Sequence, residues 1–263
     1  MKIFRMMSLL LWLTLVSACS DDKNIERDLL ADCENHYRAT SYLVAIKTCQ
    51  KAAELGVAEA QWLLANIYQY DLTGQGADPQ QAFYWFLQAA QSGWTDAQTI
   101  VGEAFLYGDG VEEDFDQAYS WLIKAADYGD PYAEFTLGYM FLSGKGKAKD
   151  ISMAISWFKK AASKEHIMSI NNLAWIYATS TQKAFRNVKK AQYWANKLSF
   201  DGEDRSVFLD TMAAVHALAG DFVQAIELQN KAIASLPEDV EESRLLEFQK
   251  HLETYQKNQP WQE

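Results

Sequence analysis

The side chains best suited to acid–base chemistry or metal binding are few and scattered along this chain. The four histidines do not show the close spacing of a metal site; they are His36, His166, His216 and His251. The Gly-x-Gly pairs recur at a fixed period, so we interpret them as turns rather than as phosphate-binding loops. The sequence therefore predicts no metal, no cofactor and no catalytic group.

Two short segments match a motif of serine acyltransferases. Ser156 and Lys159 fit the S-x-x-K pattern, and so do Ser180 and Lys183. The companion Lys-Thr-Gly and Ser-Asp-Asn elements are absent, and Ser156 only precedes a tryptophan of the repeat. We interpret both matches as chance. An envelope hydrolase or acyltransferase acting on peptidoglycan-type substrates stays as the alternative function.

Residues 1–18 have the pattern of a targeting signal. Lys2 and Arg5 precede an apolar run that ends at Val16 and is too short to span a bilayer comfortably. The next residues, Ser-Ala-Cys up to Cys19, complete a segment that resembles a bacterial lipobox. The resemblance implies lipidation of Cys19, and the serine after it implies an outer-membrane location facing the periplasm. An ordinary cleaved signal peptide and an uncleaved anchor stay open.

Cys33 and Cys49 lie eight residues on either side of Ser41, the centre of a predicted turn between two helices. This symmetry places the two thiols at the same height on antiparallel helices. In an oxidising periplasm it favours a disulfide. Two buried free cysteines, which pack as small hydrophobic groups, are the alternative.

The elements that carry these residues repeat at intervals of 36 or 37 residues. Four tryptophans mark the period, namely Trp85, Trp121, Trp157 and Trp194. A period of this size is typical of stacked helical repeats, in which no unit buries its apolar face alone. Because the tryptophans keep the repeat register, we interpret them as core residues and not as a sugar-stacking surface.

Each unit reads as two helices joined by a turn. In residues 97–129, Ala97 and Val101 recur at helical spacing on the apolar face of the first helix. Asp114 is the predicted N-cap of the second helix, and Gly129 ends it. The pattern therefore predicts that each repeat forms a helical hairpin.

The pattern A-x3-[LV]-G-x2-[FY]-x2-G-x-G-V-x2-D-x3-A-x2-W-x3-A-A-x2-G closely resembles the Sel-1-like repeat, a variant of the tetratricopeptide repeat. The match is strongest over residues 60–129 and extends to about 162. The resemblance implies an all-α fold, a right-handed α-solenoid of helix-turn-helix repeats, which binds a protein or a peptide. It implies this function by analogy only.

The predicted organisation follows the changes in this pattern. We expect a signal peptide at 1–18, a tether at 19–27, a divergent first hairpin at 28–56, Sel-1-like repeats at 57–200 (three clear and one degraded), a tetratricopeptide-like repeat at 201–237, and a capping helix with a tail at 238–263. We also expect the last residues to fray and to leave Trp261 exposed.

A net charge of −11 argues against nucleic acid or anionic lipid as the main ligand. We expect a non-enzymatic scaffold or adaptor of the cell envelope that holds a protein on its concave face and meets the membrane only through its lipid anchor. First-helix polar positions would form this contact row: Gln61, Gln98, Glu103, Glu134, Asn171 and Asn172. Because the row is neutral to acidic, a basic or amide-rich segment is the expected complement. The alternative is that these side chains are solvated helix surface with no partner.

Overall fold

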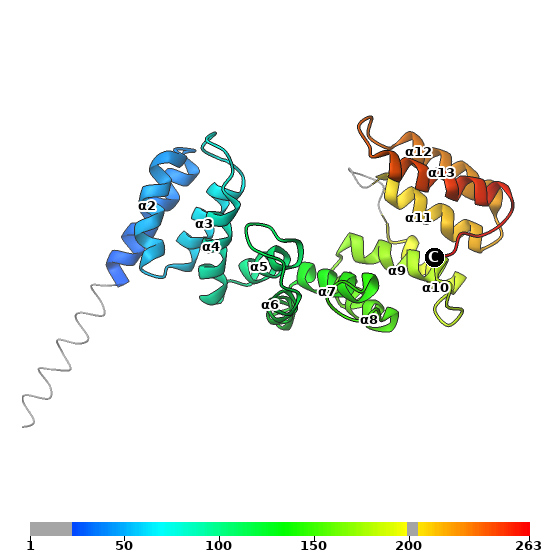
Figure 1. Ribbon diagram of the computed structural model, residues 1–263, viewed down its shortest axis with the longest axis horizontal. Helices are drawn as coiled ribbons and strands as arrows, with labels where there is room; N and C mark the ends of the chain where they lie inside the picture. Colours follow the sequence, from blue (N-terminus) through cyan, green and yellow to red (C-terminus); the bar gives the residue numbers. More distant parts are fainter. Residues whose placement is uncertain (1–22, 199–204) are drawn as a thin grey trace, which may run out of the picture. The chain divides into compact units, whose positions relative to one another are not determined.

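The computed structural model describes residues 23–198 and 205–263, and all regular secondary structure in these residues is helical (Figure 1). Cys19 and the predicted signal peptide lie outside the described residues. A first helix covers residues 23–38. It is followed by α2 (Tyr42–Glu54), α3 (Ala58–Gln69), α4 (Pro79–Gln91), α5 (Thr95–Tyr107), α6 (Phe115–Asp127), α7 (Pro131–Ser143), α8 (Ile151–Ala162), α9 (Ile167–Thr179), α10 (Val188–Ala195), α11 (Arg205–Leu218), α12 (Phe222–Ala234) and α13 (Glu242–Gln256).

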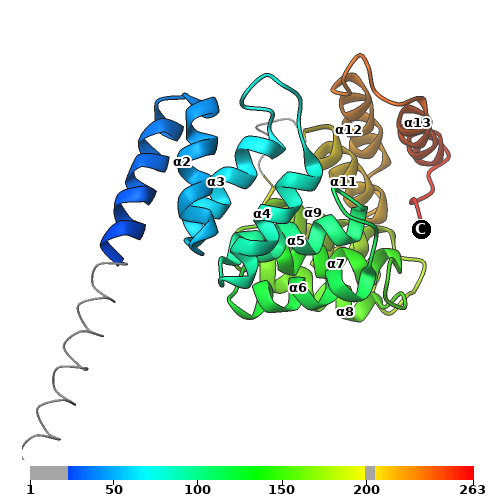
Figure 2. The ribbon, with the colours of Figure 1, turned by 60° about the vertical axis from the view of Figure 1, so that its left-hand side comes forward.

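The helices form two compact units. Unit 1 reaches to Ala133 and includes Lys145–Lys147, and unit 2 comprises Glu134–Gly144 and Ala148–Glu263. Unit 1 thus contains α2 to α6, and unit 2 contains most of α7 and the helices α8 to α13. Figure 2 shows the successive hairpins of unit 1 from the side of α2.

Aspartates begin the second helix of three repeats. Oδ1 of Asp114 accepts hydrogen bonds from the N–H groups of Asp116 and Gln117 at 3.1 and 3.0 Å, which confirms the predicted cap. Asp78 and Asp150 bond first-turn N–H groups of α4 and α8 in the same way. First-turn N–H groups have no partner within their own helix, so a carboxylate at this position satisfies them and favours the positive end of the helix dipole.

A glycine in the first helix lets the second helix approach closely. A Cβ atom on Gly102 of α5 would lie 2.7 Å from Cγ of Leu122 in α6, and one on Gly138 of α7 would lie 2.6 Å from Cε1 of Phe158 in α8. Leu122 and Phe158 are fully buried. The repeated glycine is therefore required because the partner side chain fills the space of a methyl group.

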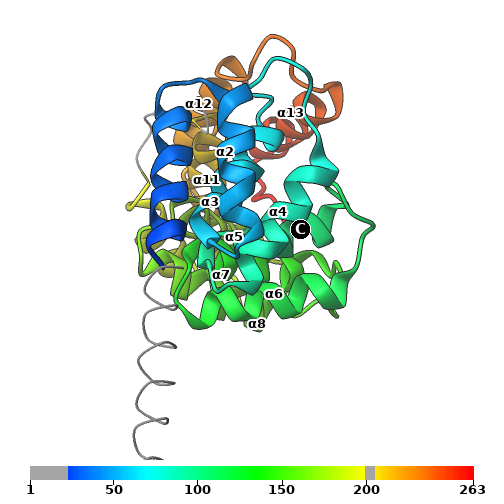
Figure 3. The same ribbon diagram turned by 90° about the vertical axis from the view of Figure 1, so that its left-hand side faces the viewer.

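The first hairpin of unit 1 is closed by a disulfide. Cys33 and Cys49 are bonded, with Cα atoms 4.5 Å apart, and both are fully buried. Figure 3 shows residues 23–38 alongside α2. The tether predicted at 19–27 is wrong in its described part, because residues 23–27 are helical. No proline or glycine interrupts these residues, so the helix continues into them.

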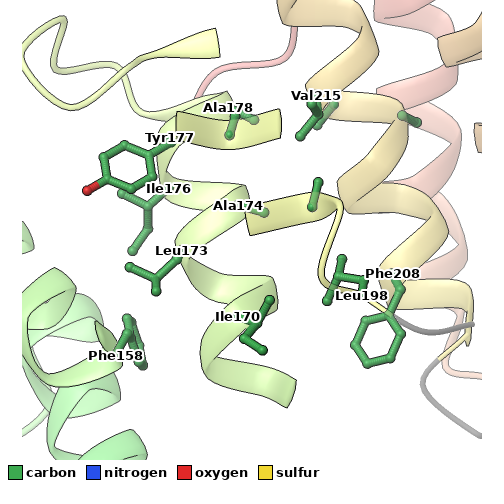
Figure 4. Packing of buried hydrophobic residues seen from close by; sticks show 14 of the residues in the cluster. Phe158, Ile170, Leu173, Ala174, Ile176, Tyr177, Ala178, Leu198, Phe208 and Val215 are labelled. Carbon is green, nitrogen blue, oxygen red and sulfur yellow. The ribbon is translucent and has the colours of Figure 1, made fainter. Parts of the chain in front are cut away.

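The core of unit 2 runs from α8 to α13. Figure 4 shows Phe158 of α8 facing Leu173 of α9, while Phe208 and Val215 of α11 lie on the other side of α9. Leu209 packs with the buried side chains of α12 and α13 in a smaller cluster. A helix that is apolar on both sides, as α9 is, has to lie between neighbours.

Candidate functional site

Most of the predicted contact row is buried. Gln61, Gln98, Glu134 and Asn171 expose only 4, 6, 3 and 3% of their surface. The prediction that these four positions recognise a partner is therefore wrong, because no partner reaches a side chain that its own repeats enclose. Glu103 and Asn172 are half-buried and remain accessible.

Hydrogen bonding between helices explains this burial. Nε2 of Gln61 donates to the carbonyl of Ala53 at 3.0 Å, and Nε2 of Gln98 donates to the carbonyl of Ala90 at 3.2 Å. These carbonyls lie in the last turns of α2 and α4, where intrahelical partners run out. These side chains join the end of one hairpin to the first helix of the next. They are therefore polar because they form hydrogen bonds inside the stack of repeats.

Side chains just beyond the ends of α4 and α8 bind two members of the same row. Oγ of Ser92 donates to Oε1 of Gln61 at 3.4 Å, and in unit 2 Nζ of Lys164 lies 2.5 Å from Oε2 of Glu134. Only 4% of the Glu134 side chain is exposed. Removing the lysine from such a pair would leave a buried, unpaired carboxylate.

Glu103 lines a pocket of about 290 Å³ between α3, α4 and α5 of unit 1. Its floor is apolar, because Phe86 and Ala104 are buried there and Phe83 and Ile100 stand beside them. The remaining lining residues form the rim; they are Gln69, Tyr70, Pro79, Glu103, Tyr107 and Asp109. The pocket thus combines an apolar floor with two carboxylates and two exposed tyrosine rings.

The turn after α5 holds one side of this pocket in place. Gly110 has φ of 70°, and a Cβ atom there would lie 2.1 Å from the carbonyl oxygen of Pro79. Only glycine fits this approach without strain. The turn consequently rests on the start of α4, and Asp109 accepts a hydrogen bond from Nε2 of Gln69 at 3.4 Å.

A second pocket, of about 320 Å³, lies between α7, α8 and α9 of unit 2. It occupies the equivalent place two repeats further along, with Trp175 at the position of Glu103 and Thr179 at that of Tyr107. Glu263, at the end of the described chain, lies in its wall.

The last described residue is hydrogen-bonded to the end of α9. The Glu263 N–H donates to the Thr179 carbonyl at 3.0 Å, and the Thr181 N–H donates to the Glu263 carbonyl at 3.1 Å. Nε1 of Trp175 donates to Oε1 of Glu263 at 2.6 Å. The expected fraying is wrong, because Trp261 is half-buried with its ring centroid 4.4 Å from that of His251.

Two ionisable groups of unit 2 that could in principle take part in catalysis are buried among other side chains. Nδ1 of His251 lies 2.8 Å from Oδ1 of Asp210, and this fully buried imidazole packs between Trp175 and Trp261. Burial holds the pKa of the Tyr255 hydroxyl well above its usual range, and the nearby Asp210 carboxylate adds to this shift. Within the described residues, no group of histidines, cysteines and carboxylates could hold a metal ion.

The repeat tryptophans belong to the packed interior. Trp85 and Trp157 expose 7 and 9% of their surface, and the half-buried Trp121 packs against the core of unit 1. Nζ of Lys124 lies 3.9 Å from the centroid of Trp121. The remaining ring surface of Trp121 is thus covered by a cation and leaves little area for stacking a sugar.

The hairpins, the caps and the repeated glycines define an α-helical repeat protein. The family model described as Sel1 repeat matches residues 58–94, 95–130, 131–166 and 167–199, more than half of the chain. The chain belongs to the Sel1 repeat family, whose members generally mediate protein–protein interactions. The last matched segment includes the repeat that the sequence showed as degraded.

Solved structures support the same fold. The chain is similar to a Sel1 repeat protein from Oxalobacter formigenes, with 20% identity and a TM-score of 0.59 over 85% of this chain and 98% of that one. It is also similar to a protective antigen of uropathogenic Escherichia coli that displays an SLR fold, with 24% identity and a TM-score of 0.57 over 81% of this chain and 49% of that one. A comparison with curated proteins found no match. None of the helices in residues 23–198 and 205–263 combines the length and apolar character needed to cross a bilayer.

Proposed function

We propose that this protein is a non-enzymatic scaffold of the bacterial cell envelope that binds a polypeptide partner on its first-helix surface. The observation that carries this proposal is the bound C-terminal segment. Its residue Glu263 pairs through backbone hydrogen bonds with Thr179 and Thr181, beside the first helix of the fourth repeat. Backbone groups of this surface therefore already form hydrogen bonds with another segment of polypeptide, which supports the proposal.

Envelope location is part of the same proposal. The lipobox-like segment ending at Cys19 would provide an acylated amino terminus, and several acyl chains anchor a protein stably. The Cys33–Cys49 disulfide supports an oxidising compartment. Mass spectrometry of the mature amino terminus should find acylated cysteine, whereas an unmodified chain that starts elsewhere would contradict the lipid anchor.

Site-specific photocrosslinking in intact cells tests the binding surface. A photoreactive residue replaces Tyr107 at the rim of the unit 1 pocket, or Tyr84 of α4, which does not line the pocket; these side chains are 54 and 49% exposed. We expect a polypeptide adduct from position 107 and none from position 84. Equal adducts from both positions, or none from either at normal protein levels, would refute the proposed binding surface.

A further inference from the structure

The segments that join the two helices of a repeat change sign along the chain. In the second repeat, all charged residues of segment 108–116 are acidic, namely Asp109, Glu112, Glu113, Asp114 and Asp116. In the fourth repeat, all charged residues of segment 181–190 are basic, namely Lys183, Arg186, Lys189 and Lys190. Residues 148–198 together contain nine lysines and arginines against two acidic residues, although the whole chain has a net charge of −11. The positive charge is thus concentrated in one part of unit 2.

Within unit 1, the acidic segment 108–116 is bound by lysines. Nζ of Lys145 lies 3.2 Å from Oε1 of Glu113, and Nζ of Lys147 lies 3.1 Å from Oδ1 of Asp116. Both lysines belong to the turn of the third repeat. The protein therefore contains its own example of a lysine-rich turn that binds a carboxylate-rich segment.

The basic segment of the fourth repeat lacks such a partner. None of its four cations forms an ion pair within residues 23–198 and 205–263. Nη1 of Arg186 is buried without a hydrogen-bond partner, and Nζ of Lys190 lies 5.2 Å from the centroid of the Tyr177 ring. A buried donor with no acceptor is costly, and a carboxylate from another molecule would supply the acceptor.

Backbone groups of the same segment already bind polypeptide. The N–H of Thr181 donates to the carbonyl of Glu263 at 3.1 Å. The carboxylate of Glu263 accepts from Nε1 of Trp175 at 2.6 Å and forms no ion pair with the four cations. The segment thus offers hydrogen-bond donors to a polypeptide while its positive charges stay uncompensated.

We propose that residues 181–190 form a second interaction surface, which binds an acidic segment of a protein. Clusters of cationic side chains recognise acidic motifs in this way. A second copy of this chain is disfavoured as the occupant, because Glu113 and Asp116 of its acidic segment are already paired. A membrane or a nucleic acid is disfavoured because a large polyanion responds to the net charge of the whole chain, whereas a short acidic segment responds to the local surface.

Nuclear magnetic resonance with an acidic peptide tests this surface directly. The full chain is titrated with a synthetic peptide that has the sequence of residues 107–116 and, as a neutral control, with the same peptide carrying Asn for Asp and Gln for Glu. We expect the acidic peptide to shift the signals of Ala184 and Lys189, to bind at least about fivefold more tightly than the control, and to weaken as salt is added. Equal binding of both peptides, or shifts confined to other residues, would overturn the inference.

Matched variants locate the charges responsible. Replacing Lys189 and Lys190 together by glutamine should weaken the acidic peptide by about threefold to tenfold, as for the loss of two exposed charge pairs. Replacing Lys47 and Lys51 together by glutamine makes the same change of charge at exposed positions of α2 and should leave binding unchanged. Thermal unfolding verifies that each variant is folded. If the first variant keeps wild-type affinity, or if the second weakens binding equally, residues 181–190 are not the site.

Titrations with other polyanions test the class of occupant. The probes are vesicles of phosphatidylglycerol and a DNA duplex, each compared with the acidic peptide on the wild type and on the Lys189 and Lys190 variant. If either probe binds through these two lysines and the acidic peptide does not bind, the occupant is not a protein and the inference is overturned.

Crosslinking in cells separates this inference from the proposed function. A photoreactive residue replaces Ala184, whose side chain is exposed. An adduct at position 184 that disappears when Lys189 and Lys190 are replaced supports the basic surface, even if position 107 gives none. An adduct at position 107 and none at 184 refutes the basic surface, while the first-helix surface stands.

Discussion

Replacing Gly102 with alanine tests the closest helix–helix contact of unit 1. The added Cβ would lie 2.7 and 2.9 Å from Cγ and Cδ2 of Leu122 and 3.2 Å from the carbonyl oxygen of Ala118. Leu122 is fully buried, so it cannot move aside without displacing its neighbours. Inserting a methyl group into such a core costs about 1–3 kcal/mol.

Helix propensity acts in the opposite direction. Alanine is favoured over glycine inside a helix by about 1 kcal/mol, so we expect Gly102→Ala to lower the free energy of unfolding by up to about 2 kcal/mol net. In a chain of 263 residues this corresponds to a fall in Tm of up to roughly 8 °C. Urea unfolding followed by circular dichroism gives the free energy, and calorimetry gives Tm.

A second substitution identifies the contact as the cause. Leu122→Ala alone should cost about 2–5 kcal/mol, because it leaves a cavity. In that background Gly102→Ala should no longer destabilise, since the methyl group then enters the vacated space and the two changes are non-additive. A Gly102→Ala variant that is more stable than the wild type would refute the close contact, because propensity alone would then govern the position.

Three further predictions concern polar groups and the disulfide. Gln98→Ala should cost about 0.5–1.5 kcal/mol in urea unfolding, because it removes one hydrogen bond to the Ala90 carbonyl, which keeps its bond from the Gly93 N–H; an unchanged midpoint would contradict the link. Burial raises the pKa of the Glu59 carboxyl group above its usual value, and the nearby Glu34 adds to this shift. The wild type should therefore lose stability relative to Glu59→Gln as the pH rises through that raised pKa. A stability difference between the two proteins that is independent of pH would refute this. Replacing Cys33 and Cys49 together by serine should cost about 3 kcal/mol for a loop of 16 residues, and thermal unfolding with and without reductant measures it.

The helices could be predicted from the sequence because their signals are local. Asp114, three residues before Gln117, specified a cap, and the repeated Gly-x-Gly pairs specified the turns. Gln98 was misplaced because its partner, the carbonyl of Ala90, lies in another helix, and the need of a helix end for donors cannot be read from periodicity. Polar residues at a helical interval resemble surface residues, because the sequence pattern does not show the hydrogen bonds that they make to other helices.

The pocket was missed for a related reason. Only Glu103 of its lining appeared in the predicted row, because Tyr107 belongs to the turn end of the first helix and Phe86 to the second helix of the preceding hairpin. Bringing three helices together creates the cavity, and no single helix carries its pattern. The bound tail was missed because the Trp175–Glu263 contact joins residues 88 positions apart.

The bonds between repeats also set an order of events in folding. Gln61 and Gln98 bind carbonyls only eight residues back, so these links close small loops at little entropic cost and form as soon as the next helix is in place. The His251–Asp210 and Trp175–Glu263 contacts span 41 and 88 residues. We therefore expect the hairpins to assemble stepwise from neighbour to neighbour, while the C-terminal segment docks as a late, separate step on repeats that have already formed.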